Sequence, residues 1–176
     1  MRTRIAIALL LAMATLKAAA EPAQGSPEAY VSQVIGESDF SVTYSRPGVR
    51  GRAVWGDLVP WGEVWRAGAN DKTVILFEED VVITGQRVPK GKYSFYVIPE
   101  RDAEWTLILN SDWEGHGTEH TVEADVLRWK ATPTTVAHEE WLRYDFDALE
   151  NTGATIYLQW ETKRIEFRFE FAPAKG

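Results

Sequence analysis

One stretch of the chain, residues 44–70, collects the side chains best suited to ligand recognition. It contains four arginines, three tryptophans and five glycines, but only two acidic residues, Asp57 and Glu63. Guanidinium groups hold carboxylate, phosphate or sulfate through paired hydrogen bonds, and indole rings pack against sugars and cations. Glycines let the backbone approach a ligand closely. The stretch therefore predicts a pocket for a small polar or anionic ligand, or for a ligand derived from a glycan.

The predicted pocket takes its polar and aromatic contacts from this stretch alone. They are Arg46, Arg52, Trp55, Trp61, Trp65, Arg66 and Asn70. The alternative interpretation is structural: the tryptophans close one end of the fold, and the arginines pair with acidic groups of the protein. The two interpretations differ in where the arginines point, which is toward a shared cavity in the first case and toward internal carboxylates in the second.

A second candidate site lies in the polar segment from Asp112 to His120. His116 and His120 are four positions apart with three carboxylates nearby, and His138 can add a third nitrogen. Imidazole and carboxylate groups together bind divalent metals such as zinc. Two glycines place the segment in a loop, which differs from the helical H-E-x-x-H zinc motif. The alternative is a pair of solvent-facing histidines in an acidic loop. A metal-assisted hydrolase is the second functional hypothesis, with a divalent metal as its cofactor.

Other catalytic signatures find no support. The chain has no G-x-S-x-G nucleophile motif, no phosphate-binding glycine loop and no cysteine. A binding protein without enzymatic activity or cofactor is therefore the leading hypothesis. A structural or interaction protein of the cell envelope, with no small-molecule ligand, is the third.

The N-terminus has the pattern of a secretory signal peptide, residues 1–20. Arg2 and Arg4 precede an apolar run at 5–16, and three alanines at 18–20 offer a cleavage site before Glu21. The apolar run is too short to span a bilayer comfortably. No cysteine follows it, which excludes lipid attachment, so we expect a periplasmic or secreted protein. Residues 21–28 are polar and are expected to form a flexible leader.

The charge of the expected mature chain argues against nucleic-acid partners. Cleavage removes three basic residues and no acids, which changes the formal net charge from −7 to −10. Nucleic-acid binding needs a basic face that neutralises phosphates. The absence of cysteine also excludes disulfides, so the domain must be stable through its core alone.

Apolar and polar residues alternate along most of the remaining chain, which is typical of half-buried antiparallel strands. In the segment 40–45, Phe40, Val42 and Tyr44 share one face. We expect about ten short strands in a single antiparallel β-sandwich or jelly-roll domain at 29–176, with a long ordered loop at 44–70. The expected strands are 30–35, 40–45, 73–77, 81–84, 93–98, 105–110, 126–131, 140–146, 155–160 and 164–171. The last two are expected to form a hairpin across Glu161, Thr162 and Lys163.

Several motifs resemble the signature of domain-of-unknown-function family 2911, a family of mostly exported bacterial proteins. They are Tyr44-Ser45-Arg46-Pro47, Gly51-Arg52, Trp55-Gly56, Leu58-Val59-Pro60, Trp61-Gly62, Val64-Trp65-Arg66 and Gly68-Ala69-Asn70 in the loop, and Gly91-Lys92-Tyr93-Ser94, Ile98-Pro99, Trp105-Thr106 with Asn110, and Asp125-Val126-Leu127-Arg128 beyond it. The resemblance covers nearly the whole mature chain. It implies a β-rich exported domain centred on the loop, and it implies no activity or catalytic residue.

Overall fold

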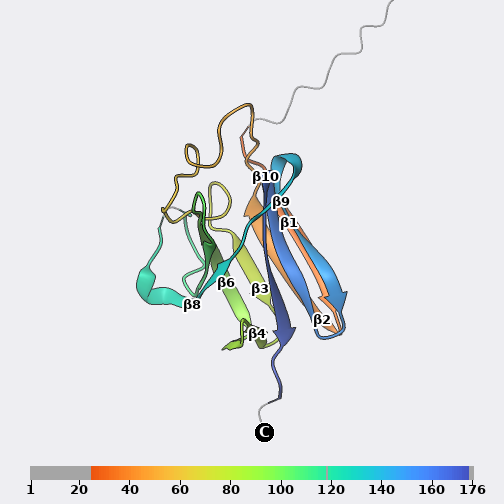
Figure 1. The fold of residues 1–176 in the computed structure, drawn as a ribbon. Helices are drawn as coiled ribbons and strands as arrows, with labels where there is room; N and C mark the ends of the chain where they lie inside the picture. Colours follow the sequence, from red (N-terminus) through yellow and green to blue (C-terminus); the bar gives the residue numbers. More distant parts are fainter. Residues whose placement is uncertain (1–24, 118, 175–176) are drawn as a thin grey trace, which may run out of the picture.

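The computed structural model describes residues 25–117 and 119–174 (Figure 1). The predicted signal peptide and the start of the predicted leader lie outside these residues. Within them the chain is all-β, and no helix has the length and apolarity that a membrane crossing needs. The only helical turn described is a 3₁₀ turn, Val122–Ala124. The strands are β1 Glu28–Ile35, β2 Ser38–Ser45, β3 Val74–Phe77, β4 Val81–Ile83, β5 Gln86–Val88, β6 Gly91–Ile98, β7 Trp105–Asn110, β8 Asp125–Ala131, β9 Thr134–Glu150 and β10 Gly153–Phe171.

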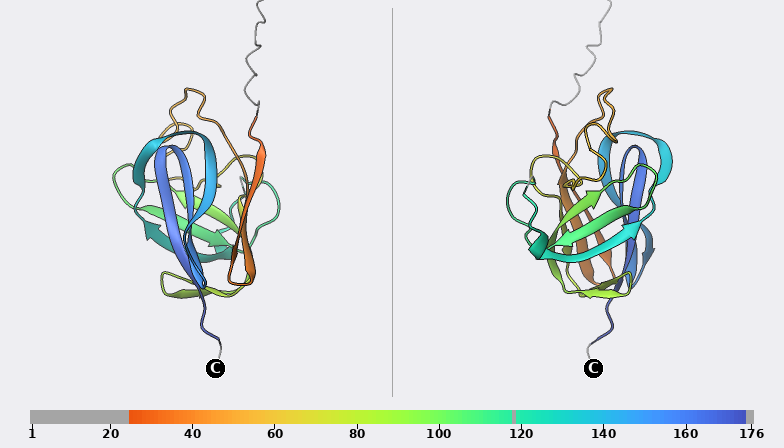
Figure 2. Two further views of the ribbon diagram at one scale, coloured as in Figure 1. Left: turned by 90° about the vertical axis from the view of Figure 1, so that its right-hand side faces the viewer. Right: turned by 60° about the vertical axis from the view of Figure 1, so that its left-hand side comes forward.

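The described strands form two antiparallel sheets. The six-stranded sheet has the order β1-β2-β3-β6-β7-β8, and the four-stranded sheet has the order β5-β4-β10-β9. The long hairpin of β9 and β10 packs over one face of the six-stranded sheet (Figure 2). This arrangement confirms the predicted antiparallel sandwich.

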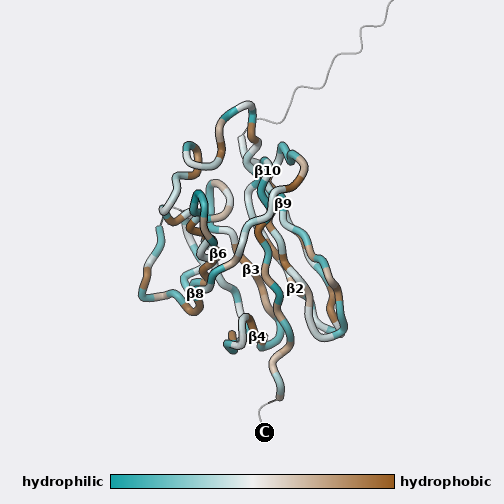
Figure 3. Tube along the Cα trace, in the orientation of Figure 1, coloured by the Kyte–Doolittle hydropathy of each residue, from teal (hydrophilic) through white to brown (hydrophobic). Residues whose placement is uncertain are grey.

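Alternation of side chains along the strands explains why the two sheets pack together. Phe40 and Val42 of β2 are fully buried, as is Phe169 of β10 in the opposite sheet. The rings of Phe40 and Phe169 lie 4.9 Å apart between their centroids. Apolar and polar residues alternate along the strands, as expected for sheets with one buried face (Figure 3). The hydrophobic core therefore lies between the two sheets.

The connection from β2 to β3 is the predicted long loop, and it lies at the end of the sandwich opposite the C-terminus (Figures 1 and 2). Backbone hydrogen bonds attach it to both sheets. Val49 N–H donates to the Glu140 carbonyl and Leu142 N–H donates to the Pro47 carbonyl, which fixes the loop to β9. Trp65 and Val97 exchange a pair of backbone hydrogen bonds on the other sheet. The loop is thus ordered, as predicted, although it contains no strand of its own.

β10 extends from Gly153 to Phe171, but it folds back on itself. The Phe171 N–H donates to the Thr152 carbonyl over 2.6 Å, and a Cβ atom on Gly153 would lie 2.4 Å from the Phe169 carbonyl oxygen. The two ends of β10 are therefore neighbours, and the chain reverses near Glu161, whose φ is +54° and where the register with β9 also shifts. This confirms the predicted hairpin across residues 161–163, with both of its arms inside β10.

Two strands differ from the prediction. β9 begins at Thr134 and ends at Glu150, well beyond the predicted 140–146, so it is not a short strand. Its first residues are mostly exposed, and the two apolar ones among them, Val136 and Ala137, are adjacent, so the sequence shows no alternation there. β5 was not expected: the expected strand 81–84 includes Thr84, which belongs instead to the turn between β4 and β5. Thr84 and Gly85 both have positive φ, at +49° and +82°, which matches a two-residue hairpin turn.

Tyr144 joins β9 to the end of the long loop, and removal of its hydroxyl group should destabilise the fold. The buried Tyr144 hydroxyl donates to the Ala67 carbonyl over 2.7 Å. We expect Tyr144→Phe to lower the free energy of unfolding by about 1 to 2 kcal/mol, because this hydrogen bond is lost. Urea unfolding at neutral pH measures the change. Tyr30→Phe, at a side chain that is 64% exposed, is the control and should leave the value unchanged.

The same residue should make the fold sensitive to alkaline pH. Burial raises the pKa of Tyr144 well above its ordinary value, so the folded protein keeps the phenolic proton where the unfolded chain releases it. Stability is therefore retained below about pH 10 and falls above it. Tyr93, Tyr96 and Tyr157, whose pKa values burial also raises, add to the fall. Urea unfolding between pH 9 and 11 should give a shallower decline for Tyr144→Phe; equal slopes for the two proteins would contradict this account.

Candidate functional site

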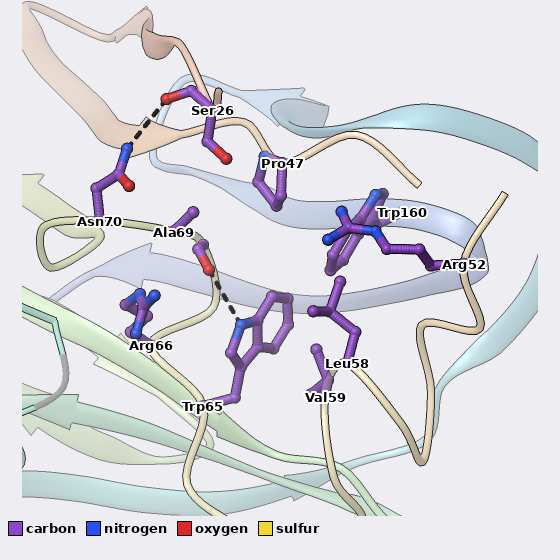
Figure 4. Close-up of a pocket in the computed structure, with 11 residues that line it drawn as sticks. Ser26, Pro47, Arg52, Leu58, Val59, Trp65, Arg66, Ala69, Asn70 and Trp160 are labelled. Carbon is purple, nitrogen blue, oxygen red and sulfur yellow. Dashed lines mark hydrogen bonds between the residues drawn. The ribbon is translucent and has the colours of Figure 1, made fainter. Parts of the chain in front are cut away.

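The long loop borders a cavity of about 330 Å³ against the middle of β10, next to Glu161 (Figure 4). Its walls combine basic, aromatic and small apolar side chains. The lining residues are Ser26, Pro47, Arg52, Leu58, Val59, Trp65, Arg66, Gly68, Ala69, Asn70 and Trp160. The lining contains two guanidinium groups and no carboxylate, which makes the cavity locally basic in an acidic protein.

Four of the seven predicted ligand contacts line this cavity: Arg52, Trp65, Arg66 and Asn70. Arg46, Trp55 and Trp61 do not. The Arg46 Nε donates to the Leu142 carbonyl over 2.9 Å, so this guanidinium fastens the loop to β9. The predicted set is therefore divided between cavity walls and structural attachments.

The three loop tryptophans belong to a cluster of indole rings. Trp55 packs on Trp105 with ring centroids 4.7 Å apart, and Trp65 stacks on Trp160 at 5.8 Å with an angle of 21° between the rings. Trp61 meets the edge of Trp105 at 6.5 Å. Both Trp105 and Trp160 are fully buried. The tryptophans thus close one end of the sandwich, as the structural interpretation expects, and Trp65 alone of the three also faces the cavity.

Three of the four loop arginines do not form the internal ion pairs that the structural interpretation requires. Among the described residues, no carboxylate lies within ion-pair distance of Arg46, Arg52 or Arg66. The Arg52 guanidinium donates to two backbone carbonyls, those of Val49 at 3.1 Å and Gly48 at 2.6 Å. These contacts leave its positive charge unneutralised beside the cavity.

Arg66 differs from the other loop arginines because its guanidinium has no acceptor in the described part of the protein. The side chain is half-buried, and its Nε atom is fully shielded from solvent and makes no hydrogen bond. Buried N–H groups nearly always have a partner in folded proteins, so an exception calls for an explanation. An unpaired guanidinium on the wall of a cavity is suited to receive an anion.

Trp160 also lines the cavity and also carries a buried donor that is unpaired within the described residues. Its Nε1 atom is also buried and has no acceptor among the described atoms. Sequence reasoning missed this residue as a wall of the cavity, because it continues the apolar face of Ile156 and Leu158 and reads as an ordinary core position. No sequence signal distinguishes it, since only the fold brings the middle of β10 under the loop.

Close packing holds Arg66 in its position. A Cβ atom on Gly117 would lie 2.2 Å from the Arg66 Cδ, so the arginine stem occupies the space that only a glycine leaves open. The Gly117 N–H donates to the Asn70 carbonyl over 3.2 Å, which ties the segment 112–120 to the loop. Asn70 itself has a positive φ of +55°, and its amide donates to the Ser26 carbonyl at 3.1 Å (Figure 4). The cavity wall is therefore built from three separate segments.

The histidine segment lies beside the cavity, but its histidines serve other contacts. His120 Nε2 lies 2.9 Å from Asp125 Oδ1. Burial alone would raise the pKa of Asp125, but hydrogen bonds from Asn110, His120 and Arg128 outweigh it and lower the pKa. His116 forms a backbone bridge with Asp71. In residues 25–117 and 119–174, no three His, Cys, Asp or Glu side chains gather as metal ligands do. The metal site at His116 and His120 stays a prediction.

Comparison with known proteins gives one match. The model of the family described as "Protein of unknown function (DUF2911)" matches residues 26–169, which include every residue that lines the cavity. No curated protein and no solved structure matched the chain. The match spans most of the 176 residues and agrees with the resemblance in the loop motifs. The chain therefore belongs to the DUF2911 family of proteins of unknown function.

Proposed function

We propose that the protein binds a small anionic ligand with an apolar portion in the loop cavity, as a binding protein without catalytic activity. The predicted signal peptide supports a location outside the cytoplasm. The single observation that carries the proposal is the Arg66 guanidinium, which lines the cavity, has a buried Nε without an acceptor and has no carboxylate partner among the described residues.

The cavity walls favour an anion over a neutral or cationic ligand. Arg52 and Arg66 both contribute to the lining, and no acidic residue does. Figure 4 shows Arg66 and Arg52 on opposite sides of the cavity, so the anionic group would contact one guanidinium at a time. A single guanidinium can donate two parallel hydrogen bonds to a carboxylate or phosphate, and bonds to a charged group are the stronger ones. Because Arg66 is half-buried, salt should screen this interaction less than it screens a surface ion pair.

The remaining walls favour a ligand that also carries an apolar group. Pro47, Leu58 and Val59 line the cavity beside Trp65. A volume of about 330 Å³ is at the lower end of the range for small-molecule sites. A planar aromatic acid such as benzoate, or a phosphate ester of similar size, combines the two properties and is a suitable probe.

Arg66→Gln should weaken anion binding strongly while leaving the fold intact. Hydrogen bonds to charged groups contribute about 1.5 to 3 kcal/mol, so we expect an affinity loss of about 10- to 100-fold for benzoate and phenyl phosphate. Isothermal titration calorimetry measures the affinity, and tryptophan fluorescence reports on Trp65 and Trp160. Benzyl alcohol, the neutral counterpart of benzoate, should bind more weakly to the wild-type protein and should respond little to the substitution.

The matched control is Arg168→Gln on β10, which changes the net charge of the protein by the same amount as Arg66→Gln. Arg168 pairs with Glu150 and Glu170 and does not line the cavity. It should leave benzoate affinity within about twofold of the wild type, because distant charges act weakly through solvent. Equal losses in the two variants, or no benzoate binding by the wild-type protein at up to millimolar concentration, would refute an anion site at Arg66.

Gly117→Ala tests the position of Arg66 without changing any charge. The added methyl group would lie 2.2 Å from the Arg66 Cδ, so the arginine stem must move away. We expect a loss of stability of about 1 to 3 kcal/mol from overpacking, together with weaker benzoate binding. Benzoate affinity that is unchanged in Gly117→Ala would show that the position of Arg66 does not matter.

A further inference from the structure

The outer face of the six-stranded sheet carries a second hollowed region, on the side away from the core. Register places Tyr30, Thr43 and Val74 side by side on β1, β2 and β3, and it places Ser41, Leu76 and Lys92 in the next row. These residues alternate with the core residues Val42 and Ile75, so they face outward. The face presents hydroxyl groups and methyl groups side by side.

Two neighbouring hollows lie on this face and share three residues. The first, of about 320 Å³, is lined by Tyr30, Ser41, Thr43, Val74, Leu76, Lys92 and Trp113. The second, of about 450 Å³, is lined by Glu28, Thr43, Asp71, Lys72, Val74, Trp113, Glu114, Gly115 and His116. Thr43, Val74 and Trp113 are common to both, so the two hollows form one trough. None of the trough residues lines the loop cavity.

Two aromatic side chains stand at the trough. Tyr30 is 64% exposed on edge strand β1. Trp113 comes from the segment after β7 and is half-buried, and the Lys92 ammonium lies 4.5 Å from the centre of its ring. This cation–π contact holds the indole above the sheet. Trp113 lines both hollows, so a ligand that occupies either one meets the indole.

We infer that this trough binds a neutral oligosaccharide of N-acetylated hexosamine units. The apolar C–H face of a pyranose ring packs on indole and phenol rings, which Trp113 and Tyr30 provide. Thr43 and Ser41 place hydroxyl groups on the floor, and Val74 and Leu76 place methyl groups beside them. An acetamido group combines an amide with a methyl group and matches this floor better than a plain hydroxyl does.

The charges around the trough favour a neutral chain. Lys92 carries a positive charge on one side. On the other side the negative charges of Glu28, Asp71 and Glu114 outnumber the positive charge of Lys72, which pairs with Asp112. A strongly charged polymer would meet a like charge in one of the two hollows. Two joined hollows also suit consecutive units of a chain rather than a single sugar. The trough thus differs from the loop cavity in its residues and in the class of ligand.

The test uses the mature protein, chitohexaose as the probe and cellohexaose as its matched counterpart without acetamido groups. Isothermal titration calorimetry should show tighter binding of chitohexaose, and Trp113→Ala should weaken it by about tenfold or more. Tyr30→Ala, at an exposed position that should not affect folding, should also weaken it. Leu149→Ala, a substitution of a 53% exposed side chain on β9, is the control and should change nothing.

Arg66→Gln separates this inference from the proposed function, because it should reduce benzoate binding and leave chitohexaose binding unchanged. Absence of chitohexaose binding by the wild-type protein would overturn the inference. Equal affinity for the two oligosaccharides, or full affinity in both Trp113→Ala and Tyr30→Ala, would overturn it as well. None of these results would contradict the proposal that the loop cavity binds an anion.

Discussion

The contact between the loop tryptophans and the end of the sandwich is the interaction on which the rest of the structure depends. The loop from β2 to β3 has no strand of its own, so it needs an apolar anchor to remain in one conformation. Trp55 on Trp105 and Trp65 on Trp160 supply that anchor, and the exchange of backbone hydrogen bonds between Trp65 and Val97 fixes its orientation. Large aromatic rings bury much apolar surface per residue, which suits a domain without disulfides.

This anchor explains how an arginine remains available for a ligand. Because the indole rings and backbone hydrogen bonds hold the loop, its guanidinium groups are not all needed for structure. Arg46 is used to fasten the loop, and Arg52 is partly used, whereas Arg66 has no partner in the described residues. The two interpretations drawn from the sequence therefore apply to different side chains. The tryptophans are mainly structural, and Arg66 is the residue that the proposed ligand would contact.

The sequence predicts the fold class well because strand alternation is a local property. Phe40, Val42 and Tyr44 show it within six residues, and the prediction of an antiparallel sandwich needs nothing more. It fails where the local pattern is weak, as at the start of β9, where the residues from Thr134 to Glu139 are mostly exposed and show no alternation. The site is only partly predictable. Arg66 stands out by type and context, but the contributions of Trp160 and Gly117 depend on which segments the fold brings together.

The central claim is that Arg66 binds an anion in the loop cavity, and a crystal structure with 4-bromobenzoate tests it most directly. Anomalous scattering from bromine locates the ligand independently of the protein atoms. The account predicts a bromine peak inside the cavity, with the carboxylate within about 3 Å of the Arg66 guanidinium. It would be contradicted by a cavity without bromine at saturating ligand, or by an Arg66 side chain that pairs with a carboxylate of the protein itself.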